Sequence, residues 1–92
     1  MALMVCRLSL EPGDDRSVLI DLPDGAKPLT VAVKDGEPCL WVLLDPALPR
    51  LPWRFHVVPA GEELGDGFSL MTYVGTFQLP SPLGSLVFHL FF

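Results

Sequence analysis

The amino-acid sequence predicts an all-β protein, built as a small, meander-rich antiparallel sandwich or barrel of about seven short strands. Ten prolines and eight glycines divide the 92 residues into short segments, and no segment carries the sustained 3.6-residue apolar repeat of an amphipathic helix. Several segments instead alternate apolar and polar side chains with a period of two, which is typical of strands with one buried face. The length fits a single β domain over residues 1–92, without a linker or an internal repeat.

The first half of the chain is predicted to form four strands. We expect them at 2–10, 16–22, 28–34 and 37–45, with turns at 11–15 and 23–25. Asp35-Gly36 lies between the third and fourth strands and favours a type I′ hairpin turn, whose two central positions both need positive φ. The third strand, with Leu29, Val31 and Val33 on its buried face, should therefore pair antiparallel with the fourth.

The run 39–44 is apolar on both faces, which indicates a central strand. Three prolines in 45–52 predict a loop, because proline donates no backbone hydrogen bond to a strand ladder. The fifth strand, 53–59, should bury Trp53, Phe55 and Val57.

A glycine-rich acidic loop at 60–67 leads into the sixth strand, 69–79, and a turn at 80–84 leads into the seventh, 85–92. In the sixth strand, the predicted apolar face holds Met71, Tyr73, Phe77 and Leu79, and the other face holds Thr72, Val74, Thr76 and Gln78. Gly75 falls on the apolar face. A glycine inside a strand marks a bulge or a close approach, so Gly75 is expected to bend the sheet or to admit a ligand.

Charge and composition restrict the partners. The net charge is −5 and the six Lys and Arg residues are scattered, so we expect no long nucleic acid, which needs clustered cations. Half of the residues are hydrophobic and only 18% are charged, below the usual quarter, which favours a homo-oligomer. The chain has no signal-peptide pattern and no uninterrupted membrane segment, so it is expected in the cytoplasm and away from membranes.

The C-terminal residues indicate where copies would assemble. Residues 68–92 contain no Asp, Glu, Lys or Arg, and the final strand is apolar on both faces. One small domain offers one core, so the second face is expected to meet another copy or another partner. The residues predicted at this oligomer interface are Phe88, Leu90, Phe91 and Phe92.

Four blocks of the sequence resemble a family of small, uncharacterised proteins encoded by bacteriophages and prophages. The blocks are Pro38-Cys39-Leu40-Trp41, Trp53-Arg54-Phe55-His56-Val57-Val58, Tyr73-Val74-Gly75-Thr76-Phe77-Gln78-Leu79-Pro80 and Leu86-Val87-Phe88-His89. The likeness runs from about Val18 to residue 92, and the third block is its most distinctive part. The resemblance transfers no catalytic residues, because that family is a domain of unknown function. It implies a short accessory protein that acts in the cytoplasm of an infected host bacterium.

A binding site is predicted on the polar face of the fifth strand. Arg54 and His56 stand two residues apart, about 7 Å along a strand, which suits the grip of one anionic group. If the fifth and sixth strands are neighbours, the sixth strand adds hydroxyl and amide donors. The predicted ligand-binding residues are Arg54, His56, Thr76, Gln78 and Tyr73, with Thr72 as a further donor.

Neither catalysis nor a metal centre is expected. Cys39 or Ser69 could in principle act with His56 or His89 and an acid such as Asp45, but no motif spacing joins them. The cysteines Cys6 and Cys39 lack the paired spacing of a zinc site and are expected to pack as small hydrophobes without a disulfide. The acidic loop 60–67 lacks the calcium-loop pattern and is read as solvated. We therefore expect no cofactor.

The function predicted from these observations is non-enzymatic binding. In its sharpest form, a phage accessory protein counters host defence by sequestering a small nucleotide immune signal in pockets between the subunits of a homo-oligomer. One alternative is an acidic protein that inhibits a host defence protein directly. Another is a virion or assembly component whose C-terminal strand extends the sheet of a neighbour. A small hydrolase has the least support.

Overall fold

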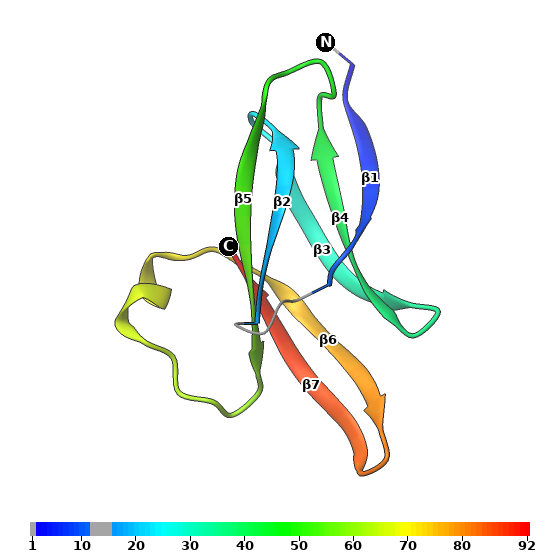
Figure 1. Ribbon diagram of the computed structural model, residues 1–92, viewed down its shortest axis with the longest axis vertical. Helices are drawn as coiled ribbons and strands as arrows, with labels where there is room; N and C mark the ends of the chain where they lie inside the picture. The colour runs from blue at the N-terminus through cyan, green and yellow to red at the C-terminus, as the bar shows by residue number, and fades with distance from the viewer. Residues whose placement is uncertain (1, 12–15) are drawn as a thin grey trace.

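The structure, a computed structural model, describes residues 2–11 and 16–92 and places seven antiparallel strands in two sheets (Figure 1). The elements are β1 (Met4–Ser9), β2 (Ser17–Pro23), β3 (Lys27–Lys34), β4 (Glu37–Leu44), β5 (Arg50–Pro59), the 3-10 helix η1 (Asp66–Leu70), β6 (Tyr73–Ser81) and β7 (Gly84–Phe91). The sheets have the orders β1-β4-β3 and β2-β5-β7-β6. The all-β prediction is confirmed. Most of the turn predicted at 11–15 lies outside the described residues.

The core fills the space between the two sheets. Phe55 and Leu90 from the four-stranded sheet meet Leu40 and Val42 from the three-stranded sheet, and all four are fully buried. The alternation predicted for 53–57 is confirmed, since Phe55 and Val57 are buried and Trp53 packs against the core. The prediction of a central fourth strand is also confirmed, because β4 pairs with β1 on one side and β3 on the other.

The β3–β4 hairpin has the turn that its sequence predicts. Lys34 pairs with Glu37, and the two residues between them have φ values of 53° at Asp35 and 80° at Gly36. Positive φ at both positions is the mark of a type I′ turn, whose twist matches that of the two flanking strands.

Substitution of Gly36 by valine should destabilise the protein by about 1–2 kcal/mol, because a side chain strains a left-handed backbone position. Urea unfolding followed by tryptophan fluorescence would measure the change. Gly67→Ala is the control: a Cβ there meets nothing within 4 Å, so the change should stay within about 0.5 kcal/mol of zero. Equal stability of the two variants would contradict the assigned turn.

Two boundary predictions are wrong for local reasons. The strand predicted to start at 53 begins at Arg50, because β5 pairs with β2 from there. Pro52 is tolerated because β7 pairs with β5 only over His56–Pro59, which leaves one edge of β5 open beside the proline. The strand predicted to start at 69 begins at Tyr73, because backbone bonds from Phe68 N–H to the Gly65 carbonyl and from Met71 N–H to the Phe68 carbonyl form η1.

Two face predictions are wrong because of bulges. The β3–β4 register shifts between Pro28 and Thr30, and Leu29 is exposed there instead of buried. The β6–β7 register shifts between Tyr73 and Gly75, so the extra residue moves Tyr73 off the face that holds Phe77. A one-residue slip reverses the direction of every side chain on one side of it.

Gly75 marks both a bulge, as predicted, and a close approach of another strand. A Cβ at this position would lie 3.2 Å from Val31 Cγ1, and β3 and β6 are in contact across the edge of the sandwich. The predicted alternative of ligand entry at Gly75 is wrong, because the side chain of β3 occupies that space.

The last strand is covered largely by its own chain. Leu90 has an exposed fraction of 0%, so its assignment to an oligomer interface is wrong: it faces the other sheet. Phe92 packs against Trp53 and Phe55, and Phe88 stacks on Phe77. β7 has paired neighbours on both sides over Phe88–Phe91, so this part offers no free edge to another protein. Interface roles for Phe88, Phe91 and Phe92, which are half-buried, stay predictions. In the part of the chain that the structure describes, no helix has the length and apolar character needed to cross a membrane.

Candidate ligand-binding face

The predicted ligand residues share one surface, the face of the four-stranded sheet that is turned away from the core. We call it the outer face. Residues opposite each other in an antiparallel register point to the same side of a sheet. The outer-face pairs are His56 with Phe91, Val58 with His89, Thr76 with His89 and Gln78 with Val87. Arg54 precedes His56 by two residues in β5 and therefore points the same way.

Arg54 and His56 form the first polar group on this face. Arg54 Nη1 donates a hydrogen bond of 2.8 Å to Ser17 Oγ in the neighbouring strand β2, and Ser17 is the direct register partner of His56. The bond holds the guanidinium beside the imidazole. Phe68 from η1 sets its ring edge-on to His56, with 5.7 Å between ring centroids.

Tyr73, Thr76 and His89 form the second polar group. His89 Nδ1 lies 3.0 Å from both the Tyr73 hydroxyl and the Thr76 hydroxyl, and the two hydroxyls also contact each other. The ring of Tyr73 lies edge-on to Phe91 at 5.2 Å. This group is bonded internally and is built for rigidity as much as for ligand contact.

The two groups are separate, so the single site predicted from the sequence is divided. β7 lies between β5 and β6, so the condition under which the sixth strand would add its donors beside Arg54 and His56 is not met. Phe91 on β7 and Phe68, which contacts it at 5.5 Å, stand between the groups. Gln78 lies further along β6, opposite Val87, and Thr72 pairs through its backbone with Phe92.

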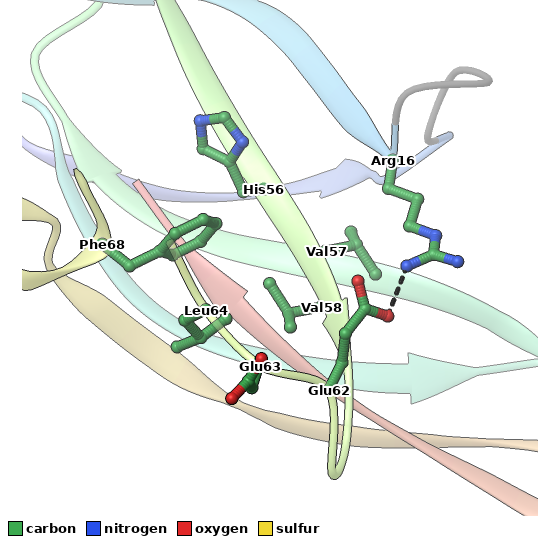
Figure 2. Close-up of a pocket in the computed structure, with 8 residues that line it drawn as sticks. All are labelled: Arg16, His56, Val57, Val58, Glu62, Glu63, Leu64 and Phe68. Carbon is green, nitrogen blue, oxygen red and sulfur yellow. Dashed lines mark hydrogen bonds and ion pairs between the residues drawn. The ribbon is translucent and has the colours of Figure 1, made fainter. Parts of the chain in front are cut away.

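A cleft of about 400 Å³ opens beside the first polar group, between β5 and the loop that follows it (Figure 2). Its lining residues are Arg16, His56, Val57, Val58, Glu62, Glu63, Leu64 and Phe68. In Figure 2 Phe68 and His56 lie toward one end, while Arg16 and the two glutamates lie toward the other. Arg16 Nη1 contacts Glu62 Oε2 at 2.6 Å. This exposed ion pair contributes at most about 1 kcal/mol.

Several cleft residues escaped the sequence reasoning. Arg16 and Glu62 are 46 positions apart, and no local pattern joins them. Glu63 was read as part of a solvated loop, and it is exposed, but it lines the cleft together with His56, Val57 and Val58 of β5. His89 is not a cleft residue, but its place on the outer face could have been predicted. Alternation along the seventh strand puts it on the same side as Val87 and Phe91, opposite to the buried Leu90.

The nucleophile and acid candidates are not brought together. Cys39 is buried in the three-stranded sheet and its thiol contacts the Glu37 carbonyl. Ser69 Oγ donates to the Asp66 carbonyl, and Asp45 accepts from the Ala47 N–H. Within residues 2–11 and 16–92, no three His, Cys, Asp or Glu side chains are placed to hold a metal ion.

Comparison with known proteins gives a family and no characterised relative. Neither the curated proteins nor the solved structures contain a match to this sequence. One family matches over the whole described sheet structure, the cleft and both polar groups, at residues 1–92. The chain therefore belongs to the family described as Domain of unknown function (DUF7352).

Proposed function

We propose that this protein is a non-enzymatic binding protein that holds a small nucleotide on the outer face of its four-stranded sheet. The carrying observation is a cleft that His56 and Phe68 line toward one end and two glutamates toward the other, with Arg54 on the same face of β5, two residues before His56. In the setting implied by the phage resemblance, the bound molecule is a host immune signal, and the protein removes it from the cytoplasm of the infected bacterium.

Arg54 and His56, on the outer face beside the cleft, suit a phosphate. A guanidinium presents its N–H donors in a planar fork that matches phosphate oxygens, and charge-assisted bonds of this kind are among the strongest. Ser17 holds Arg54 in place, which reduces the entropy lost when a ligand binds. His56, directly opposite Ser17, adds a ring N–H.

The middle of the cleft and its glutamate end suit a base and a sugar. Leu64, Val58 and Phe68 provide apolar wall, and an aromatic ring offers a base a stacking partner worth about 1–3 kcal/mol. The carboxylate of Glu63 accepts hydrogen bonds from sugar hydroxyls or an exocyclic amine. Arg16 already pairs with Glu62, and among the described residues no cation is paired with Glu63 at this end of the cleft. That arrangement favours a ligand whose negative charge lies at one end only.

A thermal-shift screen against cyclic nucleotides and ADP-ribose-type nucleotides tests this function. At a ligand concentration of 100 Kd, binding adds about 2.7 kcal/mol to stability, so we expect a rise in Tm of about 10 °C or more. Absence of a shift with every nucleotide would reject the proposal.

Substitution of Arg54 by alanine should weaken binding of the nucleotide that gives the shift by at least about tenfold, because a charge-assisted hydrogen bond contributes about 1.5–3 kcal/mol. Titration calorimetry would measure the affinity. Arg7→Ala is the matched control: it removes the same charge from β1 on the other sheet. If both variants lose affinity equally, the effect comes from net charge and the site is misplaced.

A second candidate, direct inhibition of a host defence protein, is favoured by the acidic surface. The net charge is −5, and Glu62, Glu63 and Asp66 are exposed on one loop. Such a surface would attract a basic partner. Loss of a host protein from pull-downs when Glu63 and Asp66 are changed to Gln and Asn would favour this candidate, and copurification with virions would favour a structural role instead.

A further inference from the structure

The β6–β7 hairpin extends beyond the rest of its sheet. β5 pairs with β7 only as far as Phe88, whereas β6 and β7 continue to pair up to Ser81 and Gly84. We call residues 78–87 the arm. In Figure 1 the arm projects downward, away from the other strands. The radius of gyration of 13.8 Å exceeds the value of about 12 Å expected for a compact chain of this length.

The two edges of the arm differ. The β6 edge carries Pro80 inside the strand and Pro82 directly after it. Prolines on an edge strand prevent the addition of another strand, because they supply no N–H donor. The β7 edge carries no proline and no charged residue, so it has none of these protections.

The backbone of Ser85 faces this open edge. The Val87 carbonyl accepts a bond of 2.9 Å from Ala60 N–H, so the polar groups of Val87 point toward the β5 side. Backbone direction repeats every two residues along an antiparallel strand, so Ser85 points its N–H and carbonyl to the same side. Among the described residues, β5 has already turned away from β7 at this level.

The surface beside this edge is apolar. Leu86 is 50% exposed and Leu83, at the tip, is 99% exposed. A groove of about 390 Å³ runs along the edge, lined by Pro59, Ala60, Ser85, Leu86, Val87 and Phe88. Exposed apolar surface beside an open strand edge is typical of a contact site.

We propose that the β7 edge of the arm pairs antiparallel with the same edge of a second copy, around a two-fold axis at Ser85. In this register the two Ser85 residues exchange both of their N–H to carbonyl bonds, and Gly84 lies opposite Leu86 of the second copy. Gly84 has no side chain, and a Cβ there would meet nothing within 4 Å. The leucine of the second copy therefore has room, in an interface where both copies make the same contacts.

The self-complementary register at Ser85 favours a second copy as the occupant, and the lack of charge on the arm permits its approach. Two chains of net charge −5 repel each other over most of their surfaces. The arm lies inside 68–92, where no charged side chain occurs, so here two copies can approach without like charges in contact. The proposed interface lies at Ser85 and Leu86, nearer the N-terminal end of β7 than the phenylalanines predicted from the sequence.

The test is the mass of the full chain by size-exclusion chromatography with light scattering, from about 10 to 500 µM, because a contact this small is expected to be weak. The wild-type protein should shift toward twice the chain mass as concentration rises. Ser85→Pro removes the central donor, and Leu86→Asp places a charge next to the axis, opposite Gly84 of the second copy. Both should lower the dimer affinity by at least tenfold, while circular dichroism shows an unchanged β fold.

Gln78→Asp is the matched control, since it adds the same charge to the other strand of the arm and should leave the dimer intact. A wild-type monomer at 500 µM would overturn the proposal, and so would a mass above the dimer. A dimer that survives both edge variants, or one that Gln78→Asp disrupts equally, would also overturn it. None of these results depends on the ligand cleft, because the arm shares none of its lining residues.

Discussion

Replacement of Leu90 by alanine should lower the free energy of unfolding by about 2–5 kcal/mol, the usual cost of a cavity left by a buried leucine. Leu90 is 0% exposed and lies in the core cluster with Phe55 and Leu40. Since domains of this size are stable by roughly 5–15 kcal/mol, much of the stability would be lost. Urea unfolding at low micromolar concentration would measure the change, with the slope of the transition confirming two-state behaviour.

Leu70→Ala provides the control for this substitution. Leu70 is 90% exposed in η1, so the same deletion of three carbons should change stability by no more than about 0.5 kcal/mol. A large loss at Leu90 and none at Leu70 would support the core assignment. If Leu90→Ala instead kept its stability and changed the mass of an oligomer, Leu90 would belong to an interface after all.

The second large effect is expected at Gly75, where valine should cost about 1–3 kcal/mol through overpacking. A Cβ at this position already lies 3.2 Å from Val31 Cγ1, and Val31 is buried, so its side chain has little room to move. The added methyl groups would force β6 away from β3 at the closed edge of the sandwich. Thermal and urea unfolding would measure the loss.

A double substitution separates this contact from the general cost of a side chain at Gly75. In a Val31→Ala background, Gly75→Val should cost at least about 0.5 kcal/mol less than in the wild type, because residues in contact couple by that amount or more. If the stability effects of Val31→Ala and Gly75→Val were additive, the side chain of Val31 would not be in contact with residue 75. The strain would then come from the bulge alone.

Local signals accounted for most of the elements. Asp35-Gly36 predicted its turn because the turn chemistry lies within the dipeptide, and the alternation of Trp53, Phe55 and Val57 predicted the buried face of β5. Both depend on neighbouring residues only. Gly75 indicated a bulge in β6, but the change of face at Tyr73 and the bulge at Leu29 could not be predicted in this way, because the register of a strand is decided by the partner strand and the opposite sheet.

The same contrast between local and long-range signals explains why only part of the candidate site was predicted. Arg54 and His56 lie on one face because a strand repeats every two residues. Their separation from Tyr73 and Thr76 follows from the strand order, with β7 between β5 and β6, which is a long-range property. The cleft could not be predicted either, because Arg16 and Glu62, which line it and form an ion pair, are 46 positions apart in the sequence.

The strand order also governs when the protein can fold during translation. β7 leaves the ribosome after the other described strands, yet it occupies an interior place, with β5 on one side and β6 on the other. Until it emerges, β5 keeps an unfilled edge and Phe55 lacks its contact with Phe92. The nascent sheet is therefore expected to stay incomplete until β7 has emerged, and to form late, as sheets built from long-range pairings do. Stalled or prematurely terminated chains would expose the β5 edge to chaperones and proteases.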